Sequence, residues 1–473
     1  MPQANDMNGP GKADVPYKVC VVGGGLLGAV LALRLREQGR AVTLLEAAPA
    51  IGGLASPETI GGYEWDRFYH VVLLSDLRAR ALVDELGLSD KLRWGTTRTG
   101  FFTDGTLHSM SNAVEFLRFP PLSLIDKFRL GATIALASRV RHPERLEKIL
   151  ATDWLRRWSG PTVLEKIWLP LLKSKLGDNY RIASAAFIWA IIARMYAARR
   201  SGLKREMFGY LEGGYGPLHR ALQLKLADAG VELLCGFAVG RIERDESGFT
   251  IHGAHGESVR AGQVVATMAP GLVANAVPQL SDGEKRRLAA IPYQGVVCAA
   301  LLTRKPLSEY YVTNITDGAP FTGVIEMTAL ADRALFGGNS LVYLPLYLPQ
   351  DDARWQDTDE ALRERFLAAL GRMYPHFDPA DVLDFKVSRA RRVLAISTLG
   401  YSSELMPELE TSVPGLLLLN SAQIAYGTLN VNETLGLVET MWPRLQAALA
   451  ARQSPAGAHA EGAGNPLATG VHP

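Results

Sequence analysis

Three glycines and a distant acid form the strongest chemical pattern in the sequence. Gly23, Gly25 and Gly28 follow the apolar run 18–22 as GxGxxG, and Glu46 lies eighteen residues beyond the last glycine. Gly23 permits a tight turn, Gly25 lets a pyrophosphate approach the backbone, and Gly28 lets the next helix pack closely. Glu46 can accept hydrogen bonds from ribose hydroxyls, and its charge would repel a 2′-phosphate. The pattern predicts a dinucleotide bound at a helix N-terminus.

A strand, a helix and a second strand must position these residues. The run 18–22 predicts a buried parallel strand, and 41–45 predicts a second strand that ends on Glu46. Between them, apolar residues recur at helical spacing as far as Gly39: Leu27, Val30, Leu31 and Leu35. GxGxxG alone also marks ordinary turns, but here every part of a Rossmann-type unit occurs in order.

The composition excludes several classes of protein. A chain of 473 residues suggests about two or three domains. Fifty Lys and Arg nearly balance forty-eight Asp and Glu, so the charge gives no reason to expect nucleic acid. Cys20, Cys235 and Cys298 form no CxxC pair, which argues against a disulfide framework and a zinc site. We expect no metal, and a reducing, cytoplasmic environment.

The ends of the chain and its apolar runs bear on location. Residues 1–16 lack the features of a signal peptide and are expected to be a disordered leader. Residues 453–473 are rich in Ala, Gly and Pro and predict a disordered tail. The longest apolar run, 185–193, is half of the ~18 residues that a membrane-spanning helix needs. We expect no membrane span, while contact with a membrane surface stays open.

The residues after Glu46 resemble a known superfamily. Segment 46–53 ends in Gly52-Gly53 and resembles the acid-then-GlyGly extension of flavin-dependent amine oxidases, protoporphyrinogen oxidases and phytoene desaturases. Later segments resemble further parts of the same superfamily in the same order: 212–222, 237–243, 263–270, 413–423 and 430–439. The resemblance implies that the cofactor is FAD and that the GlyGly loop lies along its phosphates.

The resemblance also implies which residues bind FAD. The backbone of Val239 should contact the adenine end, and the N-terminus of the last helix should cap the flavin ring and ribityl chain. The expected cofactor residues are Gly23, Gly25, Leu27, Gly28, Glu46, Ala47, Gly52, Gly53, Leu54, Ala55, Val239, Ala266, Asn420, Asn432, Thr434 and Leu435.

Three positions depart from the superfamily pattern. Asn420 stands where many relatives have an acid, and Leu54 stands where many amine oxidases have Arg. The lysine that amine oxidases place beside flavin N5 is absent around 295–299. A plain amine oxidase is therefore disfavoured.

The resemblance implies an α/β fold in two domains. A Rossmann-type FAD-binding domain would be assembled from the discontinuous segments 17–95, 208–288 and 386–452. Segments 96–207 and 289–385 would form an inserted substrate-binding domain of mixed sheet and helices.

The first insertion is strongly basic. Residues 111–205 contain eighteen Lys or Arg against seven Asp or Glu, and aromatic residues are interleaved with them. One interpretation is a peripheral membrane surface, with basic residues on anionic headgroups and Trp or Leu in the interface. A second is a pocket for a pyrophosphate-bearing substrate. A third is an ordinary helical cap with a solvated basic face.

Several residues are candidates for chemistry beside the flavin. The resemblance, which here includes UDP-galactopyranose mutase, implies that His70 lies near the isoalloxazine ring, where it could carry a proton. Arg67 could balance a reduced, anionic flavin. A core histidine with one satisfied nitrogen is the competing interpretation.

Four further side chains are weaker candidates. Glu326 lies in an apolar run, where its carboxylate must be paired or protonated, and a raised pKa would suit a general acid or base. A structural, hydrogen-bonded glutamate is the alternative. Tyr343, Tyr347 and Tyr426 are candidate aromatic walls of the substrate cavity.

These observations predict an FAD-dependent oxidoreductase, a dehydrogenase, desaturase or oxidase. It would abstract hydride from a C–H bond of a small, mostly apolar substrate, an isoprenoid or lipid-linked compound being the leading example. One alternative is a redox-neutral mutase or isomerase acting on a nucleotide sugar. Another is a non-catalytic protein with structural FAD.

Overall fold

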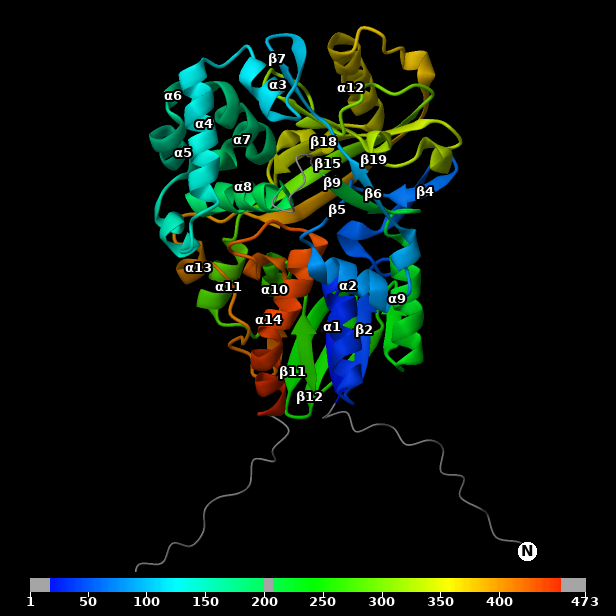
Figure 1. Ribbon diagram of the computed structural model, residues 1–473. Helices are drawn as coiled ribbons and strands as arrows, with labels where there is room; N and C mark the ends of the chain where they lie inside the picture. Colours follow the sequence, from blue (N-terminus) through cyan, green and yellow to red (C-terminus); the bar gives the residue numbers. More distant parts are fainter. Residues whose placement is uncertain (1–17, 200–206, 452–473) are drawn as a thin grey trace, which may run out of the picture.

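The protein is described by a computed structural model over residues 18–199 and 207–451. Figure 1 shows α1, α9 and α14 in the lower part of the molecule, and α4, α5, α8 and α12 in the upper part. The expected leader, 1–16, and the expected tail, 453–473, lie outside the described residues.

The lower part is built on a five-stranded parallel sheet. Its order is β10 (Glu232–Cys235), β2 (Ala41–Glu46), β1 (Lys18–Val22), β14 (Gln263–Ala266) and β20 (Leu416–Leu418). β1 is apolar because both of its faces are covered. Val19 and Val21 share a core with α1 (Leu26–Glu37), α9 (Gly216–Asp228) and α14 (Val431–Ala450), whereas Cys20 and Val22 face the opposite core. The expected Rossmann-type α/β fold is confirmed.

That opposite core is closed by a small antiparallel sheet and a pair of helices. Ile242, Phe249 and Ile251 of the small sheet pack in one core with Val264 and Leu416. The elements are β11 (Val239–Asp245), β12 (Gly248–Gly253), β13 (Ser258–Ala261), α10 (Pro270–Ala276) and α11 (Asp282–Ala289). The parallel sheet is therefore covered on both sides and exposes its strand ends to the rest of the molecule.

The upper part holds a seven-stranded sheet. Its order is β19 (Val382–Ala395), β15 (Tyr293–Thr303), β18 (Ser340–Pro349), β17 (Gly323–Glu326), β16 (Val312–Ile315), β7 (Thr99–Thr103) and β8 (Thr106–Ser109). Alternate residues of β15 face opposite cores, as a period of two requires. Val297 and Ala299 pack in the core of α12 (Asp359–Met373), and Val296 and Cys298 pack in the core that contains Trp65. β19 pairs with β15 on both sides of 385/386, so the expected domain boundary there falls inside a strand.

Short strands connect the two large sheets. β3 (Pro57–Ile60) and β4 (Tyr63–Asp66) form a hairpin, and β5 (Val72–Leu73), β9 (Met207–Leu211) and β6 (Leu92–Thr96) form a three-stranded sheet. α2 (Leu77–Glu85) lies between β5 and β6 in the sequence. The segment 66–70 begins at the last residue of β4 and contacts both parts: Phe68 packs in the core of the large sheet, and Asp66 accepts a hydrogen bond from Tyr215 N at the start of α9.

Residues 113–199 form a group of helices that we call the helical lobe. It contains α3 (Ala113–Arg118), α4 (Leu124–Ala137), α5 (Ala151–Ser159), α6 (Pro161–Val163), α7 (Leu169–Leu176) and α8 (Ala185–Arg199). α7 packs on β18, and the lobe lies at the outer side of the large sheet (Figure 1). A further short helix, α13 (Tyr401–Glu404), precedes β20. Over the described residues, no helix is both long enough and apolar enough to cross a bilayer.

Candidate active site and cofactor site

The glycine-rich loop at the end of β1 can hold only glycine at two positions. Gly23 has a φ of +112°, and a Cβ on Gly28 would lie 1.9 Å from the Gly23 carbonyl oxygen. A Cβ on Gly25 would have only the Cα of Gly53 near it, at 3.9 Å. Gly25 is also the N-cap of α1 and offers no side-chain cap. The helix N-terminus therefore presents its N–H groups toward an open surface, which suits a phosphate.

Glu46 and the GlyGly loop close around the glycine-rich loop. Glu46 Oε2 accepts a hydrogen bond from Gly24 N at 2.6 Å, and Oε1 accepts one from Ala48 N at 2.8 Å. Gly52 N donates to the Gly24 carbonyl at 2.9 Å. A Cβ on Gly53 would lie 3.0 Å from the Cα of Gly25, so the two loops touch backbone to backbone. The two glycine motifs, separated in the sequence, form one cradle.

His219 holds this cradle from the side of α9. Its Nε2 lies 2.8 Å from the Ala55 carbonyl oxygen, which can only accept, so Nε2 carries the proton. The side chain is buried, and burial lowers its pKa, which favours the neutral ring. His219 was not among the residues expected from the sequence. It lies in the recognised segment 212–222, but no local pattern reveals that α9 packs beneath the GlyGly loop.

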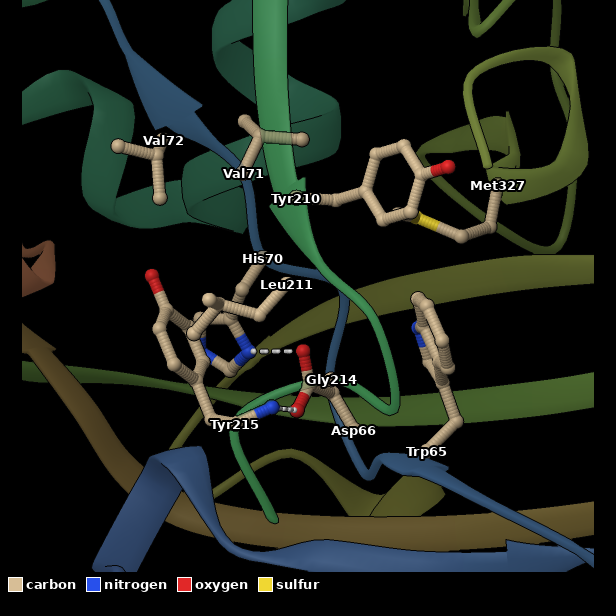
Figure 2. A pocket seen from close by; sticks show the side chains of 10 residues that line it. All are labelled: Trp65, Asp66, His70, Val71, Val72, Tyr210, Leu211, Gly214, Tyr215 and Met327. Atoms are coloured by element: carbon tan, nitrogen blue, oxygen red, sulfur yellow. Dashed lines mark hydrogen bonds and ion pairs between the residues drawn. The ribbon is translucent and has the colours of Figure 1, made fainter. Parts of the chain in front are cut away.

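His70 lines a small cavity beside this cradle (Figure 2). Its Nδ1 lies 3.6 Å from Asp66 Oδ2, too far for a hydrogen bond but close enough for an ion pair when the ring is protonated. Asp66 is buried, and its Oδ1 accepts a hydrogen bond from Tyr215 N at 2.7 Å. The ring of Tyr215 meets His70 edge to face at 5.2 Å between centroids. The remaining lining residues are Trp65, Val71, Val72, Tyr210, Leu211, Gly214 and Met327.

Residues 28–418 match the model of the flavin-containing amine oxidoreductases. The match covers most of the chain; it includes the whole seven-stranded sheet and four strands of the parallel sheet, and it begins after β1. This chain belongs to that family. It is an FAD-dependent oxidoreductase, and FAD is its cofactor, as expected from the sequence.

Curated relatives also match this chain. Coproporphyrinogen III oxidase of Mycobacterium tuberculosis is 40% identical over 79 residues, which is 16% of this chain and 18% of that protein. This stretch spans less than a fifth of the relative's length, so the relative's activity is not assigned to this chain. Flavin-dependent L-tryptophan oxidase RebO of Lentzea aerocolonigenes is 25% identical over 406 residues, 79% of this chain and 84% of the relative.

Solved structures share the fold at low sequence identity. A protoporphyrinogen oxidase-like protein from Exiguobacterium sp. 255-15 superposes with a TM-score of 0.72 at 19% identity, covering 91% of this chain and 99% of that one. Reduced UDP-galactopyranose mutase superposes with a TM-score of 0.69 at 14% identity, covering 92% and 98%. These likenesses show a common architecture for enzymes of different reactions.

The edge of the parallel sheet fits FAD. The glycine cradle leaves an uncapped helix N-terminus that suits a pyrophosphate, and Glu46, which the sequence predicts to bind a ribose, lies against the same loop. Asn420, two residues after β20, is buried. Its Oδ1 accepts a hydrogen bond from Ala422 N, and its Nδ2 has no hydrogen-bond partner among the described residues. A buried amide donor without a partner is costly, so it is well suited to a ligand oxygen.

Other expected cofactor residues lie at or near the same edge. Ala266 ends β14 and pairs with Val22 on one side and Leu418 on the other. Val239 begins β11, two residues after Phe237, whose N–H donates to the Glu46 carbonyl at 2.9 Å. Leu27 lies in the first turn of α1, and Ala47, Leu54 and Ala55 lie in the loop between β2 and β3. Their contacts with FAD remain predictions.

The residues expected at the start of α14 make contacts within the protein. Asn432 Oδ1 accepts a hydrogen bond from Arg78 N at 3.0 Å and so holds the first turn of α2. Thr434 Oγ1 donates to the Asn430 carbonyl, and Leu435 packs in the core of α1. Asn430 caps the helix through Glu433 N. These side chains position the N-terminus of α14, and a contact with the flavin would come from the backbone.

Glu326 and Tyr343 both have structural partners within the protein, and that of Tyr343 is Asp66, which lines the His70 cavity. Glu326 Oε2 accepts a hydrogen bond from Leu307 N at 3.0 Å, and Oε1 accepts one from Thr328 Oγ1 at 2.9 Å. Complete burial raises the pKa of Glu326 to about 7. Tyr343 is fully buried and its hydroxyl donates to the backbone carbonyl of Asp66. Of the two, Tyr343 supports the site by holding Asp66, and Glu326 holds the 305–310 loop.

The two remaining tyrosines and Arg67 differ in their surroundings. The hydroxyl of Tyr347 lies 3.0 Å from that of Tyr69, and Lys175 of the helical lobe lies over the Tyr347 ring at 5.5 Å. Tyr426 donates to Ser402 Oγ at 3.0 Å, near α13. Arg67 Nε is buried and has no hydrogen-bond partner within the described part of the chain. No group of His, Cys, Asp or Glu over residues 18–199 and 207–451 is arranged to hold a metal.

Proposed function

We propose that this flavoenzyme removes hydride from a C–H bond of a mostly apolar substrate, with an isoprenoid or lipid-linked compound as the leading example. The observation that carries the proposal is the lining of the His70 cavity. Apart from the Asp66–His70 pair, it consists of aliphatic and aromatic side chains and one glycine (Figure 2). The cavity is small, about 210 Å³, so it would hold only the reacting end of such a substrate, and an apolar lining with one polar pair suits that end.

The residues of the cavity have distinct proposed roles. FAD, when bound, supplies the two-electron acceptor. His70 faces Asp66 through Nδ1, so Nε2 is the ring nitrogen left to hold or move a substrate proton. Asp66 orients the ring and is itself held by Tyr215 N and by the Tyr343 hydroxyl on its carbonyl. Arg67 places a positive charge beside the site.

Substitution of His70 tests this assignment. We expect His70→Ala to retain FAD but to lower kcat by about 10²-fold or more, because a positioned proton carrier contributes that much. Turnover is measured as acceptor reduction with isoprenoid and lipid candidates, and FAD is measured after denaturation. His252→Ala, on the exposed surface of β12, is the matched control. Unchanged turnover in His70→Ala would show that His70 is only a core residue.

A second candidate is a redox-neutral reaction on a nucleotide sugar. It is favoured by the fold shared with UDP-galactopyranose mutase, at 14% identity. Such an enzyme would convert substrate without net consumption of an electron acceptor and only after prior reduction of the flavin. Turnover that consumes acceptor in proportion to product would rule it out.

We propose that the enzyme is cytoplasmic and binds reversibly to a membrane surface. The proposed substrate is poorly soluble in water, so a bilayer is its natural reservoir. The basic composition of 111–205 supports a contact with anionic lipid.

A further inference from the structure

The outer side of the helical lobe carries an apolar face that no described residue covers. Leu124, Ile125 and Phe128 of α4 are 72%, 72% and 77% exposed. Val114 and Leu117 of α3 are 57% and 56% exposed. We call these five residues the α3–α4 face. Large apolar side chains exposed together in this way mark an interaction surface rather than chance exposure.

This face is held rigidly by the residues behind it. Ser123 and Asp126 form a capping box that starts α4. Lys127 and Leu130, on the other side of α4, are buried, and Lys127 Nζ donates to the Leu117 carbonyl at 2.8 Å. α3 and α4 are therefore tied together, and the apolar side chains point outward as a fixed feature.

Three exposed basic residues adjoin the α3–α4 face in the sequence or reach the loop between its two helices. Arg118 and Arg129 are exposed next to Leu117 and Phe128, and Lys166 Nζ reaches the Pro121 carbonyl of the α3–α4 loop at 3.2 Å. Within the described residues, none of these three cations forms an ion pair. The face thus combines an apolar centre with three nearby cations that form no ion pair within the described residues.

We propose that the α3–α4 face docks on the surface of an anionic lipid bilayer. The apolar side chains enter the headgroup–acyl boundary while Arg118, Arg129 and Lys166 meet lipid phosphates. A second copy of the chain is disfavoured, because a two-fold contact through this face would bring the same cations together. The purpose of docking, delivery of an apolar substrate, rests on the proposed function, but docking itself is measurable without substrate.

Vesicle flotation of the FAD-loaded full chain tests the proposal. The probes are phosphatidylcholine vesicles with and without phosphatidylglycerol, at low salt and at about 0.5 M salt. We expect flotation with the anionic vesicles at low salt and a weaker signal at high salt. Ile125→Asp/Phe128→Asp should lower the vesicle partition coefficient by roughly tenfold or more. Replacing Arg118, Arg129 and Lys166 with Gln should remove most of the salt dependence.

Leu224→Asp is the matched control. Leu224 is 68% exposed on α9, far along the chain from the lobe, and its replacement should leave partitioning unchanged. FAD content checks that each variant is folded. Equal flotation of wild type and Ile125→Asp/Phe128→Asp overturns the proposal. So does a lipid-free wild-type dimer that the same substitutions dissociate, because the occupant would then be a second copy. A wild-type enzyme that binds the vesicles but oxidises none of the candidate apolar substrates would count against the proposed function alone.

Discussion

At the scale of single residues, His219 connects protonation to the shape of the cofactor cradle. Its neutral ring donates from Nε2 to the Ala55 carbonyl, inside the core between α9 and the GlyGly loop. Burial lowers its pKa below the value of 6.5 that it would have in the unfolded chain. As the pH falls below about 6.5, the unfolded chain binds the proton first, so stability declines until the folded ring is also protonated.

Two substitutions of His219 separate its hydrogen bond from its titration. His219→Gln can place an uncharged amide donor near Ala55, so we expect FAD affinity close to wild type and a flatter fall of stability below about pH 6.5. His219→Leu lacks the donor and leaves the buried Ala55 carbonyl unpaired, which costs about 1–3 kcal/mol. Urea unfolding across pH and FAD titration measure both effects. Equal behaviour of the two variants would contradict a hydrogen-bonding role.

Glu326 gives the opposite pH dependence. Its folded pKa of about 7 lies above the ordinary value of 4.5, so the folded state binds the proton more readily than the unfolded chain. The stabilisation is full below about pH 4.5 and is lost as the pH rises through 7. We expect Glu326→Gln to remove this loss between pH 5 and 8 in urea unfolding, while kcat stays unchanged. A large fall in kcat would instead restore Glu326 as a catalytic candidate.

At the scale of elements, α8 of the lobe is tied to α2 near the FAD-binding half. Arg194 donates to both oxygens of Asp76, at 3.0 and 2.9 Å, and Asp76 also accepts from Leu73 N. The Asp76 side chain is only 5% exposed. The start of α2 is held from its other side by Asn432 of α14. Three elements from distant parts of the sequence therefore meet at α2.

Removal of Arg194 should weaken this junction. Arg194→Leu leaves a buried carboxylate without its partner, which typically costs about 3–5 kcal/mol. Arg181→Leu is the matched control. Arg181 forms an ion pair with Asp178, but the two side chains are 68% and 92% exposed, so the pair should contribute less than about 1 kcal/mol to the free energy of unfolding. Chemical denaturation measures both. Similar losses for the two variants would show that Asp76 finds another partner.

At the scale of the whole molecule, the cofactor site depends on segments drawn from along the chain. The loops after β1 and β2 supply the glycine cradle, α9 supplies His219, and the segment after β20 supplies Asn420. Removal of FAD should therefore lower the stability of the molecule. At a concentration one hundred times Kd, returned FAD should restore about 2.7 kcal/mol.

Gly28→Ala is the variant that should lose this response. Its Cβ would meet the Gly23 carbonyl at 1.9 Å, so the loop must shift and FAD should neither bind nor stabilise the chain. Gly371→Ala in α12 is the control, because its Cβ meets nothing within 4 Å and Ala favours the helix. Thermal unfolding with and without FAD distinguishes them. Stabilisation of Gly28→Ala by FAD would contradict the cradle.

The sequence by itself determined the features that depend on local backbone geometry. The turn at Gly23, the close packing at Gly28 and the acid at the end of β2 are recognisable because each requirement involves residues near in the chain. The superfamily resemblance extended this to FAD and to the later strands, and the family match confirms the cofactor and the fold.

Only the tertiary structure decided which polar side chains share a site. His70 meets Asp66 within one short segment, but Tyr215 comes from the start of α9, Tyr343 from β18 and Met327 from the turn after β17. From the sequence, Glu326 was a candidate acid or base and Tyr343 a candidate aromatic wall. In the structure, Glu326 accepts hydrogen bonds from Leu307 N and Thr328 Oγ1, and Tyr343 donates to the backbone carbonyl of Asp66. The physical reason is that strand pairing and burial between distant segments set a side chain's partners, and no local pattern records them.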